Sequence, residues 1–159
     1  MPITSIGVAE LQKQLLQAAS ELGYQVLLGS KWLGGAECHW DKQKRQYENQ
    51  VLMQQEVWGI CFFRYRTIWI SDVIDQQHRV AILTHEVAHA LMHCGIKRIS
   101  YKVREAEAEE VCWQLGPRIG MHLKTGRTEE WQALNRWQKY AVKRRAHWAI
   151  EDLSKITAL

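Results

Sequence analysis

The segment Leu83–Gly95, with the sequence LTHEVAHALMHCG, concentrates residue types that are suited to metal chemistry. His85 and His89 stand four residues apart, so on an α-helix their imidazoles lie on one face, one turn from each other. Two imidazoles placed in this way can bind one zinc ion. Glu86 projects beside them, where its carboxylate can take a proton from a zinc-bound water. The HExxH spacing predicts a catalytic zinc site in which His85 and His89 bind the metal and Glu86 is the base.

The residues around these three make the segment apolar nearly all round, as expected of a buried helix. Removing two unpaired histidines and a glutamate from water costs several kcal/mol, and a bound metal would explain their presence. The alternative is a pair of core histidines that are satisfied by hydrogen bonds alone. His93 continues the same stripe one turn further, too far along to share the ion easily. We therefore expect His93 to make hydrogen bonds, either in the core or behind the ligands.

A catalytic zinc site with two histidines needs a third protein ligand, and the residues directly after His89 do not supply one. The next helix carries four glutamates, at Glu105, Glu107, Glu109 and Glu110. On a helical projection, Glu107 falls inside the apolar stripe of that helix, and Glu105 lies just beyond one border. A carboxylate inside an apolar stripe needs a partner, so Glu107 is the preferred third ligand and Glu105 the second choice. The other two are expected on the surface.

The two helices also resemble a known family. The segment HRVAILTHEVAHALMH resembles the active-site helix of the ImmA/IrrE family of small zinc metallopeptidases. The segment REAEAEEVCWQLGP is similar to that family's following helix, and Glu105–Ala108 matches its Glu-x-Glu-Ala pattern. The resemblance covers about residues 8–117 and implies a zincin-like fold. It also implies that the second glutamate of the pattern, Glu107, binds the metal, and that the activity is proteolysis, often of a helix-turn-helix repressor.

Hydrophobic periodicity places these motifs in an α+β fold. It predicts a helix over residues 8–22, a strand over 24–28, and two strands over 57–63 and 67–71 around a tight turn. The polar stretch 29–50 can hold one more strand near 36–40. A helix capped by Asp72 or Asp75 and stopped by Gly95 follows, with further helices over 102–115 and 129–153. We expect a small zincin-like domain, with a short antiparallel sheet backed by the HExxH helix and helical N- and C-terminal parts.

The chain has 159 residues, of which 47% are hydrophobic and 24% are charged, enough to bury one core. We expect a single domain over residues 1–159, in which residues 117–159 form a helical, basic C-terminal extension. Nine basic residues stand against four acidic ones after Gly116. Such a helix face is most often simply solvated, but it can also meet an acidic partner. No DNA-binding motif is present, so a protein partner is favoured over direct nucleic-acid binding.

The four cysteines are Cys38, Cys61, Cys94 and Cys112, and they form no CxxC pair. We expect free, buried thiols, with Cys38–His39 as a weak candidate for a metal site. No apolar run reaches the roughly 18 residues that a membrane span needs. The N-terminal residues lack the basic start and apolar run of a signal peptide. The expected location is therefore the cytoplasm, with no membrane partner.

Two functions follow from these observations. The first is a zinc-dependent endopeptidase that hydrolyses a peptide bond by zinc-activated water. Tyr101 and His122 are candidate oxyanion stabilisers, and the strand TIWIS is a candidate edge for pairing with an extended substrate. The alternative is a catalytically silent zincin-fold protein whose basic tail docks a transcriptional regulator. A purely structural zinc site is disfavoured, because it would not require Glu86.

Overall fold

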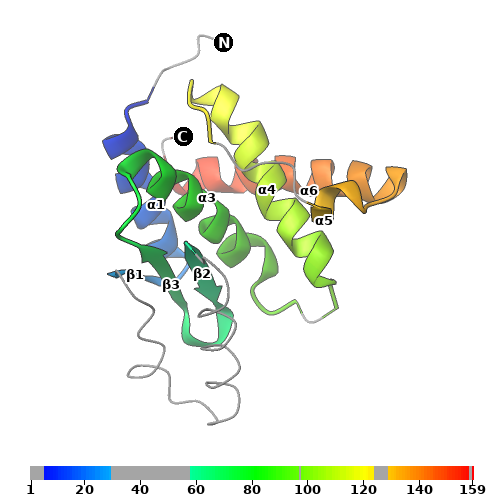
Figure 1. The fold of residues 1–159 in the computed structure, drawn as a ribbon, viewed down its shortest axis with the longest axis horizontal. Coiled ribbons are helices and arrows are strands. Elements are labelled where there is room, and N and C mark those ends of the chain that lie inside the picture. Colours follow the sequence, from blue (N-terminus) through cyan, green and yellow to red (C-terminus); the bar gives the residue numbers. More distant parts are fainter. Residues whose placement is uncertain (1–5, 30–57, 97, 124–128, 158) are drawn as a thin grey trace.

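The structure is a computed structural model that describes residues 6–29, 58–96, 98–123, 129–157 and 159. The elements are α1 (Val8–Glu21), β1 (Gln25–Gly29), β2 (Gly59–Phe62), the 3₁₀ turn η1 (Phe63–Tyr65), β3 (Thr67–Ser71), α3 (Gln76–His93), α4 (Tyr101–Arg118), α5 (Glu129–Gln132) and α6 (Arg136–Ile156). Figure 1 shows the sheet lying against α3, with α4 and α6 on the other side of that helix. The α+β class is confirmed. The strand expected near residues 36–40 and the Cys38–His39 pair lie outside the described residues.

The described strands form one sheet in the order β1-β3-β2. β1 runs parallel to β3, and β2 runs antiparallel to it. The expected antiparallel sheet is therefore wrong, because the sheet is mixed. The expectation that TIWIS is an edge strand is also wrong, since β3 is paired on both sides. Four of its five residues are buried, as suits a central strand, and β2 is the edge strand that packs against α3.

The HExxH helix α3 begins and ends as its capping residues predict. The side chain of Asp75 accepts a hydrogen bond from the backbone N–H of His78 at 3.0 Å, which satisfies one of the free donors of the first turn. The helix ends at His93, and Gly95 adopts a φ of 79°, a left-handed conformation that favours glycine.

The C-terminal residues form part of the same core. The helix expected over 129–153 is divided into α5 and α6, because Asn135 starts α6 with a capping box that it shares with Gln138. α4 lies between α3 and α6 (Figure 1). Ile150 and Leu153 of α6 pack in one hydrophobic cluster with Leu11 of α1 and Val87 of α3. Among the described residues, no helix is long and apolar enough to cross a membrane.

Candidate metal centre

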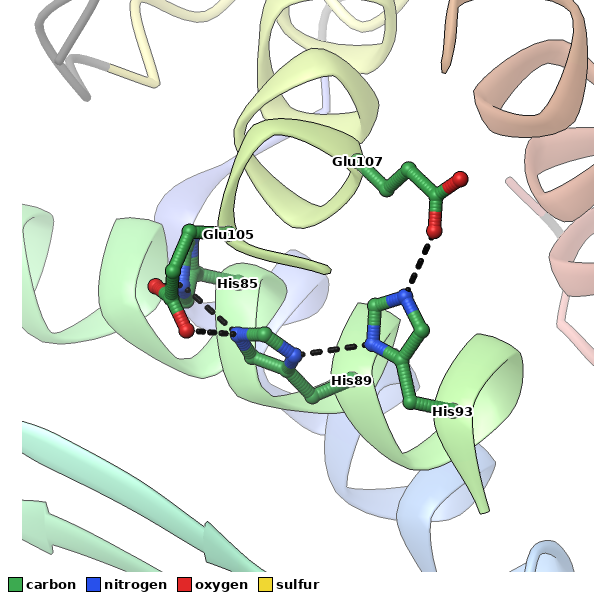
Figure 2. A network of polar contacts seen from close by, with 5 residues as sticks. All are labelled: His85, His89, His93, Glu105 and Glu107. Atoms are coloured by element: carbon green, nitrogen blue, oxygen red, sulfur yellow. Dashed lines mark hydrogen bonds and ion pairs between the residues drawn. The ribbon is translucent and has the colours of Figure 1, made fainter. Parts of the chain in front are cut away.

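Three side chains from α3 and α4 converge at one point. The Nε2 atoms of His85 and His89 lie 3.0 Å apart. Glu105 reaches across from the second turn of α4, and its two carboxylate oxygens each lie 3.3 Å from one of these nitrogens. Figure 2 shows the Glu105 carboxylate pointing at the histidine pair. Among the residues that the structure describes, this is the one group of three whose ligand atoms lie close enough together to hold a metal ion.

The spacing of these atoms suits a small tetrahedral ion. Zinc binds histidine nitrogen and carboxylate oxygen at about 2.0–2.2 Å. Two ligand atoms of a tetrahedral zinc site are therefore about 3.3–3.5 Å apart, the length of a tetrahedron edge. The observed separations of 3.0, 3.3 and 3.3 Å fall on or near this value. Two imidazoles and one carboxylate also form the donor set of catalytic zinc sites, in which a fourth position is left for water.

The charges of the three groups are coupled. Burial lowers the pKa of His85, but contacts with the Cys112 thiol and the Glu105 carboxylate outweigh burial and hold that pKa well above its usual range. Burial lowers the pKa of His89 to about 4, so its imidazole is neutral at physiological pH. Burial raises the pKa of Glu105, but the two imidazoles outweigh it and keep Glu105 ionised. Glu105 and His89 are therefore already in the forms that bind metal, whereas His85 has to release its proton when an ion binds.

Glu86 lies beside the three candidate ligands and is itself buried. Burial raises the pKa of its carboxyl to about 7, and the nearby charge of Glu105 acts in the same direction. The positive charge of His85 and a hydrogen bond from the backbone of Cys61 oppose this rise. A carboxyl whose pKa lies near neutrality can both take up and release a proton, as a general base requires.

Strand β2 approaches α3 closely at this point, and Gly59 makes the approach possible. A Cβ atom built on Gly59 would collide with the side chain of Ile82 and lie 3.2 Å from Cγ of Glu86. The lack of a side chain at position 59 therefore lets the edge strand lie directly over the Glu86 turn. Gly59 is not among the residues expected at the site from the sequence; a glycine inside a short strand pattern is the signal that points to it.

Glu107, the preferred third ligand, is not brought to His85 and His89. Its Oε2 accepts a hydrogen bond from Nε2 of His93 at 2.8 Å. Its Oε1 forms an ion pair with the Nε of Arg145 on α6. Figure 2 shows its carboxylate on the far side of α4 from that of Glu105. The structure thus brings Glu105, the second choice, and not Glu107 to His85 and His89.

Burial of a residue on α4 does not imply contact with α3. α4 is covered on two sides, by α3 and by α6, so its buried residues cover most of its circumference. Glu107 is buried and partnered, as its place in the apolar stripe predicts, but the partners are His93 and Arg145. For the same reason Glu109 and Glu110, expected on the surface, are buried.

The two candidate oxyanion stabilisers are placed very differently. Tyr101 stands one turn before Glu105 on α4, and the charges of Glu105 and Glu86 help to raise its pKa, after the larger effect of burial. Tyr101 is therefore near the site. His122 lies beyond the far end of α4, which ends at Arg118, about 20 Å along the helix from Glu105 at 1.5 Å per residue. The structure thus leaves Tyr101 as a candidate and removes His122.

Comparison with protein-family models, with curated proteins and with solved structures finds no significant match to this chain. The site is therefore interpreted from its own geometry.

Proposed function

We propose that the chain is a zinc-dependent endopeptidase, with His85, His89 and Glu105 as metal ligands and Glu86 as the general base. The observation that carries the proposal is the convergence of three ligand atoms at zinc-like spacing, directly beside a buried carboxyl of raised pKa. The resemblance of the HExxH segment to the active-site helix of ImmA/IrrE metallopeptidases agrees with this activity, although the same resemblance implies Glu107 as the third ligand.

Each residue of the site has its own role in peptide hydrolysis. Bound zinc would acidify a water molecule and polarise the carbonyl of the scissile bond. Glu86 would serve as the base that takes a proton from water and then passes it to the leaving amine, which a carboxyl with a pKa near neutrality can do. Glu105 and the two histidines hold the metal next to this carboxyl. Tyr101, one turn before Glu105 on α4, is the candidate donor of a hydrogen bond to the reacting carbonyl.

Strand β2 offers a way to bind an extended peptide. It pairs with β3 on one side, and no described strand pairs with its other side. A substrate strand added at this edge would gain backbone hydrogen bonds beside Glu86. From the family resemblance we infer that the substrate is a regulatory protein, such as a helix-turn-helix repressor.

The test compares the wild type with Glu86→Gln, which keeps the shape of the side chain but removes the base. Each protein is assayed for bound zinc, and a cell extract incubated with each is labelled at new protein N-termini. We expect about one zinc per chain in both proteins, and new N-termini only with the wild type. Chelation with 1,10-phenanthroline should suppress them. If both proteins hold zinc and give identical N-termini, the peptidase proposal fails.

A second candidate function is docking of a transcriptional regulator without proteolysis, and the outer face of α6 favours it. Trp137, Tyr140 and Trp148 are 79%, 57% and 54% exposed on this helix. The guanidinium of Arg144 lies between two of them, 5.8 Å from the Tyr140 ring and 4.9 Å from that of Trp148. Exposed aromatic rings next to a cation are typical of protein interfaces.

Docking predicts a salt-sensitive interaction that survives Glu86→Gln. It should weaken in a double variant that removes Arg144 and Trp148, because both the charge and the aromatic surface are lost. Arg145 does not belong to this face, since its side chain pairs with buried Glu107. Binding that is insensitive both to salt and to the double variant would exclude this face as the docking surface.

A further inference from the structure

A second set of polar contacts extends from the candidate metal centre into the core. Nδ1 of His89, on the side of the ring away from Glu105, lies 2.9 Å from Nδ1 of His93. Nε2 of His93 lies 2.8 Å from Oε2 of Glu107, and Glu107 pairs with Arg145 of α6. The side chains of His93 and Glu107 are 0% and 1% exposed. Figure 2 shows the line of contacts from Glu105 through the two rings to Glu107.

The carboxylate of Glu107, at one end of this line, fixes which atom donates and which accepts in each hydrogen bond. An ionised carboxylate only accepts, so Nε2 of His93 must carry the proton that it donates to Glu107. A neutral imidazole has one N–H, so Nδ1 of His93 is then an acceptor. Nδ1 of His89 must supply the proton between the two rings. Nε2 of His89 is left with its lone pair, and this is the atom that faces His85 and Glu105.

Arg145, on α6, pairs with the carboxylate of Glu107 at the end of this line of contacts. A buried carboxylate is costly unless it is paired, and a cation beside it offsets the cost of burial. The Arg145 guanidinium balances the charge of Glu107 while its own side chain stays 41% exposed. The contact is an ion pair between groups of opposite charge. Its contribution is therefore mainly one of charge.

We propose that His93, Glu107 and Arg145 are positioning residues for the metal centre, which select the tautomer of His89 that presents Nε2 to the ion. This inference rests on the proposed function, because it assumes that His85, His89 and Glu105 bind zinc. Through Arg145, the C-terminal helix α6 would then influence the geometry of the metal centre. Residues that orient a ligating histidine typically change metal affinity by about 10–100-fold when they are replaced.

A purely structural network makes a different prediction. Replacing a buried ion pair with apolar residues is often neutral or stabilising. If these residues only held helices together, their replacement would change the unfolding temperature and leave the tautomer of His89 and its affinity for zinc unchanged. The experiment therefore needs a readout of the imidazole itself.

The first measurement is the tautomer of His89 and His93 at neutral pH, obtained from the ¹⁵N chemical shifts of both rings in zinc-free protein. We expect the wild type to carry Nδ1–H on His89 and Nε2–H on His93. Glu107→Leu should lose this pattern and bind zinc about 10–100-fold more weakly, as measured by competition with a chromophoric chelator. Glu107→Gln keeps an acceptor oxygen, so it should retain more of the affinity than Glu107→Leu.

The second measurement uses neighbouring arginines of α6 as a matched pair. Arg145→Ala and Arg144→Ala remove the same charge, one position apart, but only Arg145 contacts Glu107. Arg145→Ala should weaken zinc binding while Arg144→Ala leaves it unchanged. His93→Gln, whose amide can accept from His89 and donate to Glu107, should bind zinc more tightly than His93→Phe.

The possible outcomes test the positioning role of His93, Glu107 and Arg145 separately from the metal site itself. Suppose that Glu105→Ala loses zinc while Glu107→Leu and Arg145→Ala bind it like the wild type and keep its tautomers. The positioning role is then overturned and the metal site stands. If the wild type binds no zinc, both are overturned. Unfolding of each zinc-free variant is followed by circular dichroism, so that a variant that fails to fold is replaced by its conservative partner.

Discussion

Glu105 and Glu107, two positions apart on α4, direct their carboxylates to opposite ends of one line of histidines. Glu105 contacts Nε2 of His85 and of His89, whereas Glu107 contacts His93. Two residues span about 200° of an α-helix, so these side chains leave opposite sides of α4. The same helix thus places one carboxylate at the candidate metal centre and another behind it.

The first prediction concerns the third ligand. Glu105→Ala should lose zinc, with a fall in affinity greater than the roughly 10–100-fold expected for residues behind the ligands. The measurement is zinc content after dialysis, together with competition against a chelator. Glu21→Ala, which removes an exposed carboxylate from α1, is the control and should bind zinc normally. Retention of wild-type affinity by Glu105→Ala would disprove the assignment.

The second prediction concerns the close approach of β2 to α3. Gly59→Ser should destabilise the protein by about 1–3 kcal/mol, because the added atoms collide with Ile82 and crowd Glu86. The same substitution at Gly7, where no atom lies within 4 Å of the built Cβ, should be neutral or stabilising because serine is a good N-cap. Urea unfolding of both variants checks this. Equal stability would show that β2 can shift without cost.

The third prediction is a pH dependence of stability at the start of α3. Hydrogen bonds from the backbone and side chain of His78 hold the pKa of Asp75 below its ordinary value of 3.8. A lowered pKa means that the stabilisation is fully present above that ordinary value and is lost as the pH falls through the folded-state pKa.

Asp75→Asn tests this dependence, because asparagine keeps the cap but does not titrate. Thermal unfolding should show the wild type more stable than Asp75→Asn near pH 6, with the difference shrinking as the pH falls below 4. A difference that stays constant across this range would contradict the assignment.

The fourth prediction concerns the C-terminal helix as part of the core. Ile150 of α6 is 1% exposed and packs in the main hydrophobic cluster. Ile150→Ala should reduce the free energy of unfolding by about 2–5 kcal/mol, because it removes buried methyl groups and leaves a cavity. Leu28→Ala, at a site that is 53% exposed, should change it by only about 0.5 kcal/mol. Chemical denaturation followed by circular dichroism distinguishes the two.

Much of the local structure could be read from the sequence. The caps of α3, the glycine stops after α1 and α3, and the helical phase of His85 and His89 depend on neighbours within one or two turns. Residues so close in sequence determine each other's positions through backbone geometry alone. The hydrogen bonds of His93 were also expected, because it follows His89 by one turn.

The pairing of the strands in the sheet could not be predicted from neighbouring residues in this way. Alternation of side chains shows that TIWIS is a strand, but it does not show which strands lie beside it. The central place of β3 depends on its parallel pairing with β1, which is distant in the sequence. Among the described strands, this pairing places β2, and not β3, at the edge of the sheet beside Glu86.

The sequence shows that two histidines and a glutamate stand on one helix at metal-binding spacing, and that a second helix carries acidic residues. Which glutamate meets the histidines follows from the packing of the folded chain. A helical projection gives the direction of each side chain, but it cannot say which neighbouring helix covers that direction. α6 covers the side of α4 that holds Glu107 and supplies Arg145, and α3 covers the side that holds Glu105. The pairing of charges across these two interfaces therefore fixed the composition of the site.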